Sequence, residues 1–187
     1  ETHHLGLFFE RDWTPTSDRI SYGHDIEASW LLWEAVNALG DESLRARALP
    51  VVLNIVDAIL AEGCDQDGAI CNLGGPEGIV DHNKEWWPQA EGMVGFLNAT
   101  QISGDSRYLE AALRLWDFIE ERLIDRQNGE WFRGVDRSGA VLSEFSKVGF
   151  WKCPYHNGRA ALEGISRLNS LGHQVSPDDF KSVAANP

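Results

Sequence analysis

Helical periodicity along most of the chain is the feature that most constrains how this sequence can fold. Apolar residues recur at spacings of three and four, which is the period of a helix with one buried face. Gly40 is expected to stop the first helix, Pro50 to kink or split the second, and Pro88 to lie in the first turn of the third. The period predicts five helices, over residues 25–39, 42–60, 88–102, 107–124 and 157–168.

Two turn-rich stretches separate these helices into pairs. They predict one short β-hairpin over residues 67–80 and another over 129–142. The Gly40-Asp41 break recurs at Gly104-Asp105, roughly sixty residues later, and the glycine pattern of the first hairpin recurs in the second. A repeated helical hairpin of this length is typical of a toroid. We therefore expect an all-α fold, in which two and a half repeats cannot close the ring.

The composition excludes several classes of partner. The formal net charge is −13 and the isoelectric point is about 4.8, so the surface repels nucleic acid and anionic lipid. No apolar run is long enough to span a membrane. Cys64, Cys71 and Cys153 fit no CxxC spacing, which favours reduced thiols in a cytoplasmic protein and disfavours a zinc site. The chain begins at Glu1 rather than methionine, so we expect residues 1–187 to be a single partial domain of a longer polypeptide.

Eight tryptophans are an unusually large number for 187 residues. Most buried tryptophans are core residues. However, Trp86-Trp87 precedes Pro88, and Trp151 precedes Pro154, so both groups lie near helix starts. Tryptophans at such positions often line a cleft, where a flat indole can cover the C–H face of a sugar. Both interpretations stay open on aromatic content alone.

The first candidate catalytic segment is Ser21–Trp30. His24 falls at the start of a predicted helix, and Glu27 lies three positions later on the same face. The unpaired amides of a helix N-terminus favour the neutral imidazole that a general base requires, whereas the nearby carboxylate acts in the opposite direction and can fix the tautomer. The alternative is an ordinary capping region, with acidic residues that complement the helix dipole.

The second and third segments repeat this arrangement. Trp87 and Glu91 are four residues apart, so an indole and a carboxylate share one helix face, unless Trp87 packs under the hairpin and Glu91 is solvated. His156 lies between Pro154 and Asn157, which is a plausible helix cap. If alternate helices form the inner layer, the three segments converge. His3-His4, at an end expected to fray, and His82, expected on the surface, carry little weight.

Three stretches resemble the cellobiose 2-epimerases of the N-acylglucosamine 2-epimerase superfamily. They are SYGHDIEASWLL at 21–32, WWPQAEGMVGF at 86–96 and WKCPYHNGRA at 151–160. The resemblance implies an (α/α)6 barrel, of which this chain is the C-terminal half. It implies two catalytic histidines, His24 and His156. It also implies five substrate contacts, at Glu27, Trp30, Trp87, Glu91 and Trp151.

The resemblance further implies an isomerase that epimerises C2 of the reducing-end glucose of β-1,4-linked disaccharides such as cellobiose and lactose. Two imidazoles on opposite faces of C2 can do this without a metal or other cofactor. The missing N-terminal half would carry a further histidine and an arginine, so the chain alone is expected to be inactive.

Three alternatives remain. The first is an N-acylglucosamine 2-epimerase or aldose–ketose isomerase of the same superfamily. The second is a toroid glycoside hydrolase with Glu27 and Glu91 as its acid–base pair. The third is a noncatalytic carbohydrate-binding domain.

Overall fold

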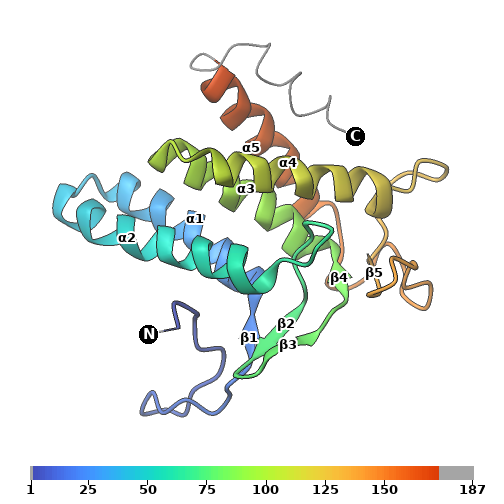
Figure 1. Cartoon of the computed structure of the whole chain (residues 1–187), viewed down its shortest axis with the longest axis horizontal. Coiled ribbons are helices and arrows are strands. Elements are labelled where there is room, and N and C mark those ends of the chain that lie inside the picture. Colours follow the sequence, from blue (N-terminus) through green and yellow to red (C-terminus); the bar gives the residue numbers. More distant parts are fainter. Residues whose placement is uncertain (1, 173–187) are drawn as a thin grey trace.

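The computed structural model describes residues 2–172. Within them, three helices form one row and two more pack against its outer side (Figure 1). The inner row consists of α1 (Tyr22–Leu39), α3 (Trp86–Ser103) and α5 (Tyr155–Gly172). The outer pair is α2 (Glu42–Ala58), which packs on α1, and α4 (Ser106–Phe118), which packs on α3. The predicted all-α partial toroid of helical hairpins is confirmed.

The central inner helix, α3, is buried along almost its whole length because it contacts α1 on one side and α5 on the other. This explains why its sequence is apolar and small-residue-rich all round rather than amphipathic. In the part of the chain that the structure describes, no helix combines the length and the apolar character that a membrane crossing requires.

Four of the five helices begin one to three residues earlier than predicted. α1 begins three residues early, at Tyr22, because the Ser21 hydroxyl caps it by accepting a hydrogen bond from the His24 backbone amide. α5 begins at Tyr155, so the predicted cap at Asn157 is wrong. That residue lies inside the first turn, and its side chain donates to Glu130 instead.

α2 passes through Pro50 as one helix, so the expected split does not occur. Its buried face, which includes Val52, Ile55 and Val56, holds the segment against the core despite the lost hydrogen bond. α2 and α4 each continue into one π-helical turn, η1 (Ile59–Gly63) and η2 (Ile119–Leu123).

Short β-strands connect the helix pairs, as predicted, and the hairpin expected over residues 67–80 forms with its second strand in place, but its first strand lies at residues 73–75 rather than 67–70. β1 (Ile20–Ser21), β2 (Leu73–Gly75) and β3 (Gly78–Asp81) form an antiparallel sheet. β4 (Lys84–Glu85) pairs with β5 (Gly134–Val135). Residues 67–70 and 129–132 instead form tight loops after the π turns. One β-bridge closes each loop: Cys64 pairs with Ile70, and Ile124 pairs with Trp131.

The internal repeat is visible in the backbone. Gly40 and Gly104 both adopt left-handed conformations at the ends of inner helices, with φ of 66° and 72°. Gly68 and Gly129 do the same in the loops after the π turns, with φ of 83° and 74°. Equivalent glycines therefore serve equivalent turns, and the inner helices all start at one end of the molecule.

Candidate active site

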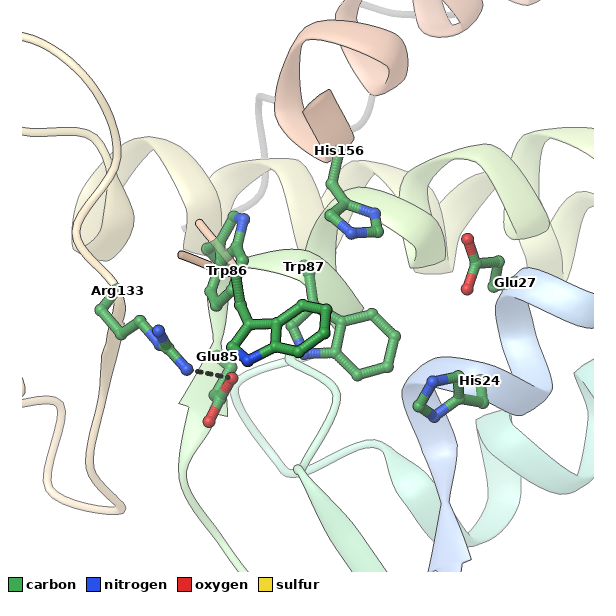
Figure 2. A pocket seen from close by; sticks show the side chains of 8 residues that line it. His24, Glu27, Glu85, Trp86, Trp87, Arg133 and His156 are labelled. Atoms are coloured by element: carbon green, nitrogen blue, oxygen red, sulfur yellow. Dashed lines mark ion pairs between the residues drawn. The ribbon is translucent and has the colours of Figure 1, made fainter. Parts of the chain in front are cut away.

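A pocket of about 350 Å³ opens at the N-terminal ends of the three inner helices (Figure 2). Five of the seven residues singled out in the sequence contribute to its wall: His24, Glu27, Trp87, Trp151 and His156. The remaining three are Glu85, Trp86 and Arg133; the sequence pointed to Trp86 only as a tryptophan near a helix start, and sequence reasoning missed the other two. The structure thus brings together the starts of α1, α3 and α5.

Trp87 lies between the two imidazoles. Its ring centroid is 4.8 Å from that of His24 and 5.8 Å from that of His156. The indole can approach His24 because the preceding residue, Gly23, has no side chain, and a Cβ there would overlap the Trp87 ring. The close packing of Trp87 therefore requires a glycine immediately before His24. The Ser21 hydroxyl lies 2.7 Å from His24 Nδ1 and orients that ring.

His156 is oriented by a buried carboxylate. Its Nδ1 lies 2.6 Å from Glu91 Oε1, and the other oxygen of Glu91 accepts a 3.0 Å hydrogen bond from Trp30 Nε1. Because a carboxylate accepts hydrogen bonds, this contact favours a proton on Nδ1 and leaves Nε2 of His156 available as a base. Glu91 is only 1% exposed, so its position is well fixed.

Arg159 joins the two carboxylates of the site. Its guanidinium lies 2.5 Å from Glu91 and 3.0 Å from Glu27, and it stacks on the Trp30 ring at 4.8 Å. Burial opposes the charged form, but the hydrogen bonds to Glu91 and Glu27 raise the pKa of Arg159 above its ordinary value. The arginine therefore compensates negative charge beneath the pocket. It lies three residues after His156, so helix spacing places both side chains on the same face of α5.

Trp30 and Glu91 are buried behind the pocket rather than in its wall. Their predicted direct contact with substrate stays a prediction, and the geometry favours positioning roles instead. The expectation of a frayed end at His4 is wrong: its side chain is 4% exposed because its ring contacts Asp25 at 2.7 Å and Glu62 at 3.3 Å. His82 is only partly exposed, with its ring 3.9 Å from Asp65.

The end of the pocket away from His24 is polar and aromatic (Figure 2). Arg133 lies 3.8 Å from Glu85 and covers the face of Trp86 at 4.8 Å. Burial raises the pKa of Glu85, while the charge of Arg133 partly lowers it. Glu85 belongs to β4 and Arg133 to the loop before β5, and the pairing of these two strands brings them together.

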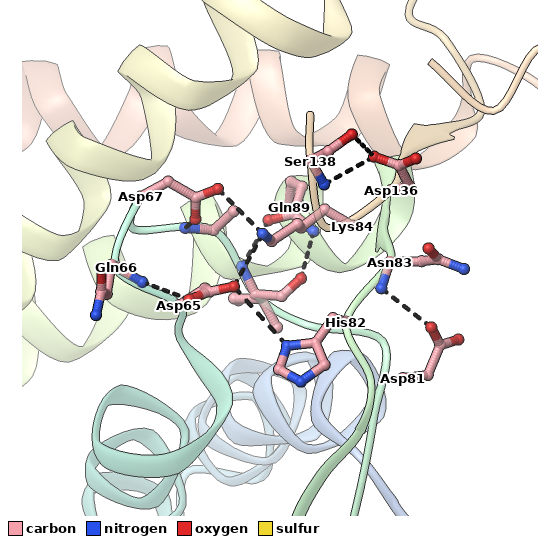
Figure 3. Close-up of polar contacts among 12 residues, drawn as sticks. Asp65, Gln66, Asp67, Asp81, His82, Asn83, Lys84, Gln89, Asp136 and Ser138 are labelled. Carbon is pink, nitrogen blue, oxygen red and sulfur yellow. Dashed lines mark hydrogen bonds and ion pairs between the residues drawn. The ribbon is translucent and has the colours of Figure 1, made fainter. Parts of the chain in front are cut away.

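Within residues 2–172, two groups of side chains have donor atoms close enough to hold a metal ion. In the first, formed by Glu27, Glu91 and His156, the Arg159 guanidinium already contacts both carboxylates. In the second, formed by Asp65, Cys71 and His82, burial raises the pKa of the Cys71 thiol to about 11, so the thiolate ligand is disfavoured at neutral pH. The Lys84 ammonium also contacts Asp65 there (Figure 3).

Residues 1–160 match the sequence model of N-acylglucosamine 2-epimerase (GlcNAc 2-epimerase). The chain belongs to the N-acylglucosamine 2-epimerase family. Among curated members, it is 45% identical over 166 residues to cellobiose 2-epimerase of Bacteroides fragilis, covering 87% of this chain and 42% of that protein. It is 28% identical to the bovine N-acylglucosamine 2-epimerase over 88% of this chain and 40% of that protein.

Solved structures support the same relationship. A sugar epimerase from a ruminal bacterium superposes on this family member with a TM-score of 0.85 and 41% identity, covering 89% of this chain and 42% of that one. A D-mannose isomerase shares the fold with a TM-score of 0.79 and 22% identity, over 88% and 45% of the two chains. The chain thus spans about two fifths of the length of its relatives.

Proposed function

We propose that the protein containing this chain is a sugar 2-epimerase, which interconverts glucose and mannose at the reducing end of β-1,4-linked disaccharides. The observation that carries the proposal is the pair of imidazoles, His24 and His156, on either side of the Trp87 indole in one pocket. Family membership and the named cellobiose 2-epimerases among its relatives support the reaction class.

The reaction needs a base on each face of one carbon. In the open-chain aldose, one imidazole removes the proton from C2, and the electron pair of the C2–H bond forms the C1–C2 double bond of an enediolate. The other imidazole then donates a proton to the opposite face of C2, and the carbonyl re-forms. No net oxidation occurs, so two histidines can carry out both proton transfers at C2. We assign these roles to His24 and His156 without assigning a face to either.

The carboxylates and tryptophans serve orientation. Glu91 holds the Nδ1 side of His156, which directs Nε2 toward the pocket. Glu27 lines the pocket and can accept a hydrogen bond from a sugar hydroxyl. Trp87 and the largely exposed Trp151 offer flat apolar surfaces for the sugar rings.

Solvent isotope incorporation tests the proposal. The complete protein is incubated with cellobiose in D₂O, and NMR follows the sugar. We expect 4-O-glucosyl-mannose with deuterium at C2, and we expect His24→Asn and His156→Asn each to abolish turnover. His82→Asn is the matched control, because this histidine lies outside the pocket. Near-normal rates in either pocket variant would overturn the assignment.

The products also separate the rivals. Free glucose would indicate a glycoside hydrolase, and fructose at the reducing end would indicate an aldose–ketose isomerase. Epimerisation of N-acylglucosamine but not of cellobiose would indicate the other epimerase branch. Binding of cellobiose without any product, unaffected by the histidine substitutions, would indicate a noncatalytic sugar-binding protein.

A further inference from the structure

Two lysines are among the most deeply buried side chains of the molecule. Lys84 is 2% exposed and Lys152 is 0% exposed. Burial of an ammonium group is costly unless it is paired and hydrogen-bonded. Each lysine immediately precedes an inner helix: Lys84 lies two residues before the start of α3, and Lys152 lies three residues before the start of α5.

Each lysine is paired with an acidic residue of the loop after the preceding π turn. Lys84 Nζ lies 3.0 Å from Asp65 and 3.1 Å from Asp67, between the two carboxylates (Figure 3). Lys152 Nζ lies 3.0 Å from Glu130. Gly68 and Gly129 occupy equivalent places in these two loops, so both lysines are tied to the same loop of the internal repeat, although Asp65 and Asp67 precede the glycine and Glu130 follows it.

Glu130 joins Lys152 to the start of α5. One oxygen of Glu130 accepts hydrogen bonds from Lys152 Nζ, from the Asn157 side chain at 2.9 Å and from the Trp131 amide at 3.0 Å. Glu130 has φ of +62°, a conformation that residues other than glycine rarely adopt. Such local strain persists where surrounding contacts hold it in place.

The contacts of Glu130 lie on both sides of His156, a proposed catalytic residue. Lys152 precedes His156 in the sequence, Asn157 follows it, and both bind the Glu130 carboxylate. Lys152 Nζ also lies 5.4 Å from the centroid of Trp86, which lines the pocket. In α3, Gln89 adds to the Lys84 contacts by exchanging hydrogen bonds of 2.8 Å with the backbone of Ile70.

We propose that Lys152 and Lys84 are positioning residues, which fix where α5 and α3 begin and thereby aim His156 and Trp87 into the pocket. This inference depends on the proposed epimerase function for its kinetic consequences, but not for its structural ones. Lys152 acts on proton transfer through His156. Lys84 acts on substrate binding through the tryptophan surface.

The kinetic test uses Lys152→Met and Lys84→Met in the complete protein. A displacement of about 1 Å at a reacting group can lower a rate by about a hundredfold. We therefore expect Lys152→Met to lower kcat by about ten- to a hundredfold with KM little changed, and to increase the isotope effect on kcat with cellobiose deuterated at C2. Lys84→Met should mainly raise KM, because stacking contributes to substrate binding.

Arg126→Met is the matched control. Arg126 lies in the same loop as Glu130 and also pairs with a carboxylate, Glu120, at 3.2 Å, but this ion pair is exposed. We expect kcat and the isotope effect of Arg126→Met to stay near wild type. A similar loss in this control, or a normal isotope effect in Lys152→Met, would overturn the proposal, because loss of folded protein changes neither the isotope effect nor KM.

A readout without substrate separates this inference from the proposed function. The Nδ1 proton of His156, shielded by Glu91, should give a downfield proton resonance that His156→Asn removes. We expect Lys152→Met to lose this resonance and Arg126→Met to keep it, whatever reaction the protein catalyses. If Lys152→Met does not fold, Asn157→Ser is a smaller change that removes the hydrogen bond from the Asn157 side chain to Glu130. This variant should weaken the same resonance. An unchanged resonance would refute the inference.

Discussion

At the scale of single residues, the pocket depends on side chains with several partners each. Glu91 contacts His156, Arg159 and Trp30 at once. Its carboxylate is deeply buried, and three donors satisfy it, so the arrangement has little freedom to adjust. A substitution at Glu91 should therefore affect catalysis much more than a substitution at a surface residue would.

Glu91→Gln should lower kcat by roughly a hundredfold, the scale of a general acid–base contribution. The amide keeps the shape of the side chain but can present an N–H to His156 Nδ1, which favours the wrong tautomer. Steady-state kinetics on cellobiose would measure the effect. Glu34→Gln is the control, because Glu34 also pairs with an arginine of α5, Arg167, but away from the pocket. Equal losses in both variants would argue against a specific role for Glu91.

Gly23→Ala should weaken substrate binding and lower turnover, because the new methyl group would displace the Trp87 indole. The expected result is a KM raised several-fold together with a changed tryptophan fluorescence spectrum. Gly158→Ala makes the same substitution in the first turn of α5, where a Cβ meets no atom. That variant should retain its kinetics, and a normal KM in Gly23→Ala would contradict the packing argument.

The three free cysteines should differ in reactivity. Burial raises the pKa of the Cys64 thiol to about 12 and that of Cys71 to about 11, whereas Cys153 is exposed. Because the thiolate is the reactive form, brief iodoacetamide treatment of the native protein at pH 8 should modify Cys153 alone. Peptide mass spectrometry would locate the label, and early labelling of Cys71 would show that its loop opens.

At the scale of elements, the loop after η2 is held by one buried acid. Hydrogen bonds from Lys147 and from the Asn128 backbone and side chain hold the pKa of Asp125 far below its ordinary value. A depressed pKa means that the folded state binds the proton less readily than the unfolded state. The stabilisation is therefore complete above the unfolded value of about 3.9 and is lost as pH falls below it.

The free energy of unfolding should show this dependence. From pH 5 to pH 2, the wild-type protein should lose stability more steeply than Asp125→Asn, which has no carboxylate to protonate. Urea titrations at several pH values would give both curves. Parallel curves would indicate that Asp125 titrates normally. Asp18→Asn serves as the comparison, since this aspartate makes no ion pair within the described residues.

The elements also explain how far the sequence could predict the fold. The five helices were predictable because their apolar spacing is local information. The β4–β5 pair was not, because its strands lie about fifty residues apart in the sequence and neither has a periodicity of its own. The same pairing brings Glu85 near Arg133, so these two pocket residues were missed, whereas His24, Trp87 and His156 could be found from helix-start signals.

At the scale of the whole molecule, the pocket has walls only from the starts of α1, α3 and α5 and from nearby loops. The chain also spans about two fifths of the length of its relatives. We therefore expect the 187-residue chain, expressed alone, to be folded but to epimerise cellobiose at no measurable rate, whereas the complete protein is active. Circular dichroism and product NMR on the two proteins would test this, and comparable rates would contradict it.

The proposed reactive groups all lie at helix starts, so none of them lies at the C-terminal ends of α1 and α3. The tight turns at Gly40-Asp41 and Gly104-Asp105 lie one helix length away, roughly 25 Å from the pocket. Those turns are suitable attachment points for a fluorophore, a surface linkage or an inserted peptide. An immobilised biocatalyst anchored there would keep its pocket facing the sugar solution.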